Sequence, residues 1–304
     1  FIIVAIGSVI AARLLGPGDY GLFTLAMIIP SMFCHLSDLG ISTALIRFTA
    51  KFKHESEKRK VVNLIKTGIG FKAILSLILA ITLFLLSETF AKEILKRPDI
   101  TLPIRLGSLF FWGKAILTTI YSIFIGLDLA DKQGLLMNIQ AITDAVSRPV
   151  LIFMGLGVVG SILGVGLSNI LAAGIGLLLI LLLVSSLNHH SHGENFNFPQ
   201  QVRVLVTYGM PIYISTLILS IMNEFGLFVL AFFTSNIEVG YYGIVKNFST
   251  LMALLHYPIS TSLFPAFSKL NMPKDRGTFI KMFNFAVIYT SILIIPSSLA
   301  LSVL

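Results

Sequence analysis

Long apolar stretches recur along the whole chain and are separated by short polar segments. They lie at residues 1–12, 20–48, 62–86, 101–127, 134–156, 159–187, 205–233, 240–268 and 280–304. All but the first are long enough to cross a bilayer, which takes about 20 residues of helix. Barrel strands alternate polar with apolar positions and these stretches do not, while an open strand in lipid leaves backbone groups unpaired. The pattern predicts an all-α polytopic membrane protein with nine spans.

Composition agrees with this prediction. Hydrophobic residues make up 56% of the 304 residues and charged residues only 12%, against about 25% charged in soluble domains. Mean hydropathy is +0.91. These values exclude a soluble enzyme, a disordered tail and a disulfide-built secreted domain, and the single cysteine, Cys34, cannot form an intrachain disulfide. Both ends of the sequence fall inside apolar stretches, so we expect a fragment of a longer protein.

The basic residues predict an orientation. If the N-terminus is cytoplasmic, the inner loops hold twelve Lys and Arg residues and the outer loops hold five. Cytoplasmic loops carry such an excess, so we expect a multi-pass protein of the cytoplasmic membrane with its N-terminus inside. This bias accounts for the net charge of +8, and the protein needs no nucleic-acid partner.

An internal repeat divides the chain. Ile41–Leu45 (ISTAL) reappears as Ile259–Leu263 (ISTSL), an offset of 218, and with one residue of slip Asp19–Gly21 matches Glu238–Gly240. The repeat spans six transmembrane segments, so the two halves share one orientation, as in several transporters. We expect an N-terminal lobe at 1–187, a cytoplasmic linker at 188–204 and the start of a C-terminal lobe at 205–304. An intact protein would then have about twelve spans.

Ionisable residues inside the spans are candidate functional residues, because a charge in the membrane is costly. Lys72 and Lys114 lie near mid-span with no acidic residue within four positions, and this favours a water-filled cavity that attracts anions. Asp144 and Arg148 have ion-pair spacing and form either a structural or a functional pair. Ser31, His35, Asp38 and Ser42 share one predicted helical face. Similar polar stripes surround Lys114, Arg148 and Glu224, and such stripes either pack helices together or contact a substrate.

Known catalytic and metal-binding patterns are absent from the sequence. It contains no G-x-x-x-x-G-K-[ST] phosphate loop, H-E-x-x-H or G-x-S-x-G motif. His189, His190 and His192 have metal-ligand spacing but no carboxylate or Cys to complete a site, which favours a solvated loop. We predict a protein that is not an enzyme, with no catalytic residue, metal or cofactor.

Two strings resemble the N-terminal signature of a known family. They are Arg13–Gly21 (RLLGPGDYG) and Asp38–Phe48 (DLGISTALIRF), and they are similar to those of Wzx-type polysaccharide flippases of the multidrug/oligosaccharidyl-lipid/polysaccharide exporter superfamily. Tyr208–Pro211 and Leu263–Ser268 are similar to the start of that family's second lobe and its first inner loop. The resemblance implies two helix bundles in a V around a central cavity, and alternating access for a lipid-linked oligosaccharide such as an O-antigen precursor.

The resemblance also implies roles for the candidates. Lys72, Lys114 and Arg148 would receive the pyrophosphate of a polyprenyl-linked glycan, with Asp38 and Asp144 nearby. Asp38, Asp144 or Glu224 would bind a coupling H⁺ or Na⁺, and the sequence does not choose between these ions. Family members often carry an acidic–basic pair in span seven, whereas Asn223–Leu227 has Glu224 without a basic neighbour. Membrane lipid and other polysaccharide-assembly proteins are further candidate partners.

Two alternatives stay open at this point. A multidrug/cation antiporter of the same superfamily would use cavity carboxylates, and the lone cations Lys72 and Lys114 argue against it. A membrane-embedded glycan polymerase or ligase would need a long extracytoplasmic loop, which the sequence lacks.

Overall fold

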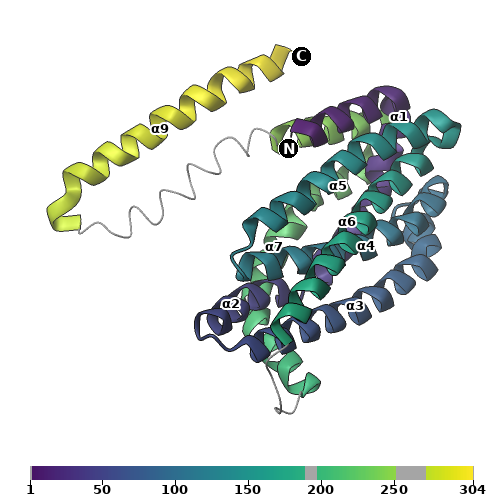
Figure 1. Ribbon diagram of the computed structural model, residues 1–304. Coiled ribbons are helices and arrows are strands. Elements are labelled where there is room, and N and C mark those ends of the chain that lie inside the picture. Colours follow the sequence, from purple (N-terminus) through teal and green to yellow (C-terminus); the bar gives the residue numbers. More distant parts are fainter. Residues whose placement is uncertain (1, 189–196, 251–271, 304) are drawn as a thin grey trace. The chain divides into compact units, whose positions relative to one another are not determined.

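The computed structural model describes residues 2–188, 197–250 and 272–303 (Figure 1). These ranges are almost entirely helical and contain no strand. The helices are α1 (Ile2–Leu36), α2 (Ile41–His54), α3 (Lys58–Thr89), α4 (Thr101–Gly126), α5 (Ala130–Leu151), α6 (Gly157–Asn188), α7 (Phe198–Phe233) and α9 (Met272–Val303). Residues 236–250 are also helical. The prediction of an all-α membrane protein is confirmed.

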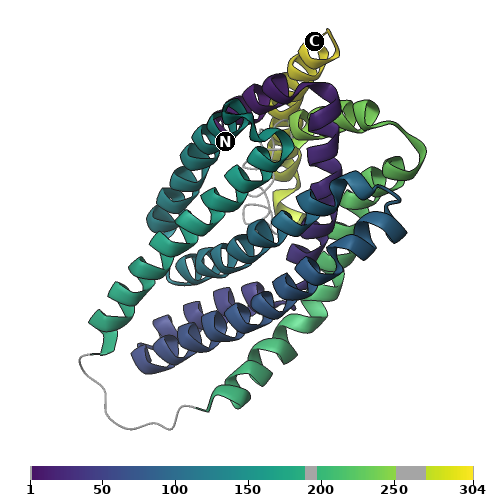
Figure 2. The same cartoon turned by 90° about the vertical axis from the view of Figure 1, so that its right-hand side faces the viewer.

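Six stretches of the described chain are long and apolar enough to cross a membrane. The fourth, Ala130–Ser186, contains the turn between α5 and α6 and therefore holds two helices. Gly155 (φ 86°) and Gly157 (φ 48°) form this turn, because glycine adopts positive φ without steric cost. Figure 2 shows the resulting hairpin. Most of the predicted span 240–268 lies outside the described residues.

The predicted span 20–48 is not one continuous helix. Helix α1 runs from Ile2 to Leu36 with a kink at Gly16 (φ 73°), and α2 begins only at Ile41. Between them, Leu39 (φ 47°) and Gly40 (φ 74°) adopt left-handed conformations. Residues 37–40, hereafter the α1–α2 break, therefore place Asp38 in a turn instead of on the expected helical face.

Contacts divide the chain into two compact units, Ile2–Tyr242 and a second that begins at Gly243. In the first unit, buried apolar residues of α2, α3, α4 and α6 form one core around Leu117, Ile120 and Phe124. A second core, around Leu25 and Phe111, also includes Leu227 and Ala231 of α7. Helix α7 thus belongs to the same compact unit as α1–α6, and the predicted division into lobes at 188–204 stays a prediction.

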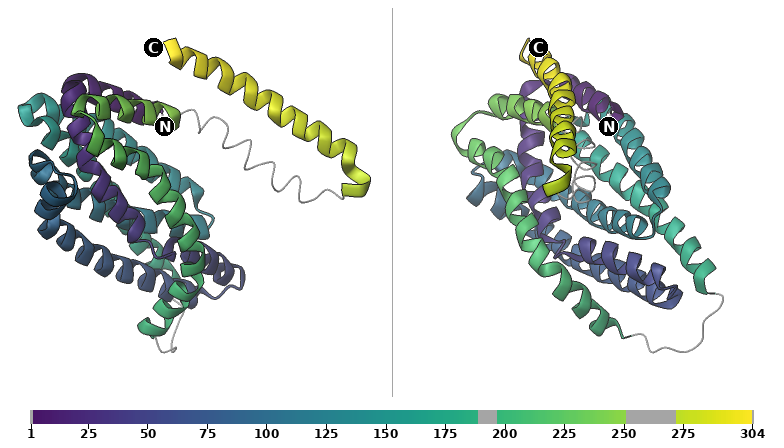
Figure 3. Two further views of the ribbon diagram at one scale, coloured as in Figure 1. Left: turned by 180° about the vertical axis from the view of Figure 1, so that it is seen from behind. Right: turned by 90° about the vertical axis from the view of Figure 1, so that its left-hand side faces the viewer.

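Helix α7 packs against α1, α2 and α3, and Figures 2 and 3 both show it running beside α1. Two of the close backbone contacts in the unit join its first 40 residues to residues beyond 200. A Cβ on Gly40 would collide with Gly209 of α7, and a Cβ on Gly209 would collide with Gly40. A Cβ on Gly21 would likewise collide with Asn236, and a Cβ on Gly240 would collide with Pro17. These crossings are closer than any residue with a side chain permits.

The candidate repeat is only partly inside the described structure. Residues 259–263, the expected counterpart of Ile41–Leu45, lie outside the described residues, as do His189, His190 and His192. In the part of the chain that is described, no group of three or more His, Cys, Asp or Glu side chains forms a metal site.

Candidate functional site

Lys72 lies buried at the α1–α2 break. Its side chain comes from α3 and is 2% exposed. The ammonium donates to the Ser37 carbonyl oxygen (2.7 Å) and to Asp38 Oδ1 (3.3 Å), and the Ser42 hydroxyl donates to the same Asp38 oxygen. The carboxylate that Lys72 lacks within its own helix comes from the break, 34 positions away, and the predicted role of Lys72 toward an anionic substrate stays a prediction.

This arrangement has a structural purpose. The last carbonyls of a helix have no partner inside the helix, and cationic donors near that end are favourable. Lys72 supplies such a donor to Ser37, and the Tyr213 hydroxyl of α7 donates to the Leu36 carbonyl oxygen (3.0 Å). The break is thus held by side chains from α3 and α7.

Lys114 on α4 is half-buried, and it differs from Lys72 in its partners. Within the described residues its ammonium makes no hydrogen bond or ion pair. It interacts electrostatically with Cys34 of α1 and Asp144 of α5, and Cys34 interacts with both Lys72 and Lys114. The hydroxyls of Thr118 and Ser122, predicted to share its polar face, donate to carbonyls of their own helix.

Asp144 and Arg148 of α5 form the ion pair that their spacing predicts. Arg148 Nε donates to Asp144 Oδ1 (2.7 Å) and Nη2 donates to Oδ2, so the pair is bidentate. Both side chains are buried, and Arg148 also lies over the ring of Phe23 at 6.0 Å. Helix α6 approaches closely because Gly164 has no side chain: a Cβ there would come within 2.8 Å of Arg148. The charges of Asp144 and Arg148 largely compensate one another.

A chain of polar side chains links α4, α5 and α6. The Tyr121 hydroxyl donates to Gln140 Oε1 (2.9 Å), Gln140 Nε2 donates to Asn169 Oδ1 (3.0 Å), and Asn169 Nδ2 donates to the Val165 carbonyl oxygen (2.7 Å). Asn169 is not among the site residues predicted from the sequence. The available signal was an amide in an otherwise apolar helix, since a buried polar group there needs a partner.

The structure therefore brings five of the six predicted site residues into one region. Asp38 pairs with Lys72 and Asp144 pairs with Arg148. Lys114 interacts electrostatically with Asp144 and with Cys34, which also interacts with Lys72. The sixth, Glu224, is half-buried on α7, about three helical turns beyond Tyr213. The roles of all six in binding or ion coupling stay predictions.

A pocket that the sequence did not indicate, hereafter the carboxamide pocket, lies between α2, α3 and the start of α7. Its volume is about 340 Å³. Four carboxamides line it: Asn63, Asn197, Gln200 and Gln201. The other lining residues are Phe48, Phe52, Lys60, Leu64 and Val204. Thr67 of α3 donates to Gln201 (2.7 Å), which ties α3 to α7 beside this pocket. The carboxamides at 197–201 fall within the predicted linker at 188–204. The sequence did not indicate a pocket there, because only the fold places these side chains against α2 and α3.

Comparison with a solved structure shows which known fold the chain resembles. The chain is similar to the inward-facing conformation of a multidrug resistance MATE family transporter of the MOP superfamily, with a TM-score of 0.63 and 15% identity over 98% of this chain and 68% of that one. At this identity the likeness shows the fold alone.

A family model identifies the protein family. The model described as "Polysaccharide biosynthesis protein" matches residues 1–271, so the chain belongs to the polysaccharide biosynthesis protein family. This finding confirms the resemblance seen in Arg13–Gly21 and Asp38–Phe48. No curated protein matches the chain.

Proposed function

We propose that this protein moves a lipid-linked oligosaccharide across the cytoplasmic membrane by alternating access. Membership of the polysaccharide biosynthesis family and the transporter fold support a membrane transporter. One observation carries the choice of an anionic substrate. Lys114 is a half-buried cation with no counter-ion in contact within the described residues, whereas Lys72 and Arg148 each pair with a carboxylate.

The role of Lys114 is electrostatic. The pyrophosphate of a polyprenyl-linked glycan is highly charged and loses hydration as it enters the membrane, which costs free energy unless a cation compensates it. Lys72 and Arg148 already have carboxylate partners, so Lys114 is the cation that meets the phosphates first. Uncharged hydrogen-bonding groups of the α4–α6 network and of the carboxamide pocket accommodate sugars.

Ion coupling follows from the same pairs. Asp38 and Asp144 each hold a cation, so a coupling H⁺ or Na⁺ would bind either carboxylate only after Lys72 or Arg148 moves away. Glu224 on α7 is the third candidate. No step in this scheme requires covalent chemistry.

The orientation belongs to the proposal. Lysines and arginines at 47–60 favour a cytoplasmic α2–α3 turn. Glu55→Cys and Lys96→Cys in the full-length protein should react from opposite faces of intact cells. Labelling of position 55 by an impermeant external reagent would reverse the orientation.

The transport proposal is tested by Lys114→Ala in a strain that lacks its own flippase. Surface glycan should appear about tenfold more slowly at matched protein level, because a charge-assisted contact contributes about 1.5–3 kcal/mol and each 1.4 kcal/mol is a factor of ten. Lys66→Ala, which removes an exposed lysine, is the control and should change the rate less than twofold.

Normal export by the Lys114→Ala protein would show that this cation does not serve the substrate. If unmodified protein leaves surface glycan absent yet expels a cationic dye, the protein is a multidrug antiporter instead.

A further inference from the structure

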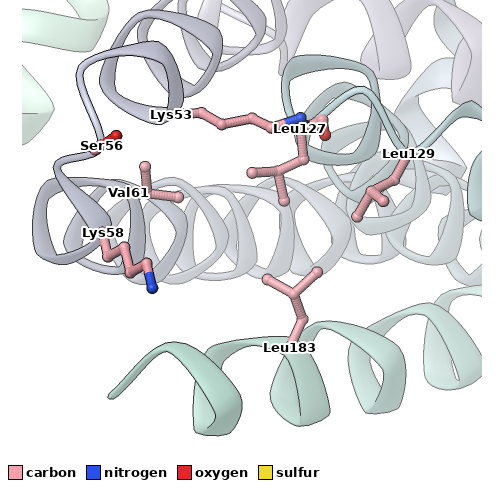
Figure 4. A pocket seen from close by; sticks show the side chains of 7 residues that line it. All are labelled: Lys53, Ser56, Lys58, Val61, Leu127, Leu129 and Leu183. Carbon is pink, nitrogen blue, oxygen red and sulfur yellow. Dashed lines mark hydrogen bonds between the residues drawn. The ribbon is translucent and has the colours of Figure 1, made fainter. Parts of the chain in front are cut away.

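A second pocket lies at the end of the helix bundle, where the α2–α3 turn, the α4–α5 turn and the last turns of α6 meet (Figure 4). Its volume is about 290 Å³. Val61, Leu127, Leu129 and Leu183 form the apolar part of its wall, and its two ionisable lining residues are Lys53 and Lys58. The pocket therefore combines an apolar surface with positive charge.

The two lysines differ in how they are held. The Lys53 ammonium donates to the Leu127 carbonyl oxygen (2.6 Å) and pairs with Asp128 (2.9 Å), so it is fixed at the rim. Lys58 is exposed, and its ammonium has no hydrogen bond or ion pair to the described parts of the protein. The adjacent carboxylate, Glu57, pairs with Lys60 instead (2.8 Å). Figure 4 shows the Lys58 side chain reaching toward the side of the pocket formed by α6.

The apolar wall continues onto the surface of α6. Leu178, Leu181 and Leu182 are 61%, 64% and 68% exposed, on the same helix as Leu183. Exposed leucines on a helix that crosses the membrane are covered by acyl chains. An acyl chain that follows this surface to the end of α6 reaches Leu183 and, beside it, the two ammonium groups.

We propose that this pocket binds the phosphate headgroup of an anionic phospholipid. Lys58 and Lys53 attract the phosphate, and Leu129 and Leu183 contact the first methylene groups of the chains. Basic pockets at the ends of membrane helices bind anionic headgroups in this way. The volume suits a headgroup, since pockets that enclose small molecules start at about 300 Å³. The site requires no glycan and is separate from the Lys114 region.

The test measures lipid binding to the purified full-length protein by native mass spectrometry. Dioleoylphosphatidylglycerol and dioleoylphosphatidylcholine are titrated separately. The unmodified protein should bind the anionic lipid more tightly, and Lys58→Gln should weaken that binding about fivefold while leaving the neutral lipid unchanged, as expected for one lysine near an anionic lipid. Lys51→Gln removes the same charge from an exposed position outside the pocket and should have little effect.

A second variant separates the pocket from surface charge. Leu129→Trp fills the cavity at constant charge and should also weaken binding of the anionic lipid. Equal binding of the two lipids, or equal losses for Lys51→Gln and Lys58→Gln, would overturn the proposal. Displacement of the lipid by millimolar inorganic phosphate would do so as well, because the site would then serve a soluble anion. None of these results depends on whether the protein exports glycan.

Discussion

Lys72 and Lys114 look alike in the sequence and differ in the structure. Each is a lysine inside an apolar span without an acidic residue within four positions. Lys72 is buried, pairs with Asp38 and satisfies a helix-end carbonyl, whereas Lys114 is half-buried and has no such contact among the described residues. The difference shows that a lone charge in a membrane helix marks either a structural contact between helices or an open site. The partners decide which, and they come from distant segments.

Loss of the Asp38 carboxylate at the α1–α2 break should have the largest effect on stability. Asp38→Asn leaves the ammonium of Lys72 buried without its counter-charge, and removing one partner of a buried pair costs about 3–5 kcal/mol. We expect the free energy of unfolding in detergent to fall by about 3 kcal/mol. This is the lower end of the range, because the Asp38 side chain is 28% exposed and the pair is only partly buried.

A double-mutant cycle provides the control for this prediction. Lys72→Met combined with Asp38→Asn removes the buried charge and should recover part of the stability. Equal losses in the single and the double variant would contradict the account of Lys72 as a structural cation.

The contact between Gly40 of the α1–α2 break and Gly209 of α7 should be the next most sensitive feature. Gly209→Ala places a methyl group against the backbone of Gly40, and overpacking of this kind costs about 1–3 kcal/mol. Thermal unfolding should show the loss. Gly174→Ala on α6 is the matched control, because a Cβ at Gly174 meets nothing within 4 Å. If both alanine variants melt at the same temperature, the α1–α2 break and α7 are not in close contact.

The smallest effect on stability is expected at Lys114. Lys114→Ala removes a half-buried charge that has no contact partner, so the free energy of unfolding should change by less than about 1 kcal/mol. The same variant should export glycan poorly. A stability loss as large as that of Asp38→Asn would place Lys114 with Lys72 among the structural cations and would end the contrast between them.

The sequence predicts what depends on local spacing. Apolar length identifies the spanning helices, and the four-residue spacing of Asp144 and Arg148 predicts the pair that forms. The Asp38–Lys72 pair joins residues 34 positions apart across a non-helical break, so helical periodicity does not detect it. Gly40 was the available signal, because glycine just beyond a helix commonly adopts the left-handed conformation. The carboxamide pocket depends entirely on how α7 packs, which spacing does not encode.

The backbone crossing near Gly21 has a consequence for the internal repeat. With the offset of 219 that relates Asp19–Gly21 to Glu238–Gly240, Pro17 corresponds to Asn236 and Gly21 to Gly240. Gly21 faces Asn236 and Gly240 faces Pro17, so each half presents the same two positions to the other. This reciprocity is the mark of an isologous interface, which subunits of a two-fold dimer form. The two predicted repeats would meet there as two such subunits do, within a single polypeptide, and a side chain added at either glycine would push against the same contact.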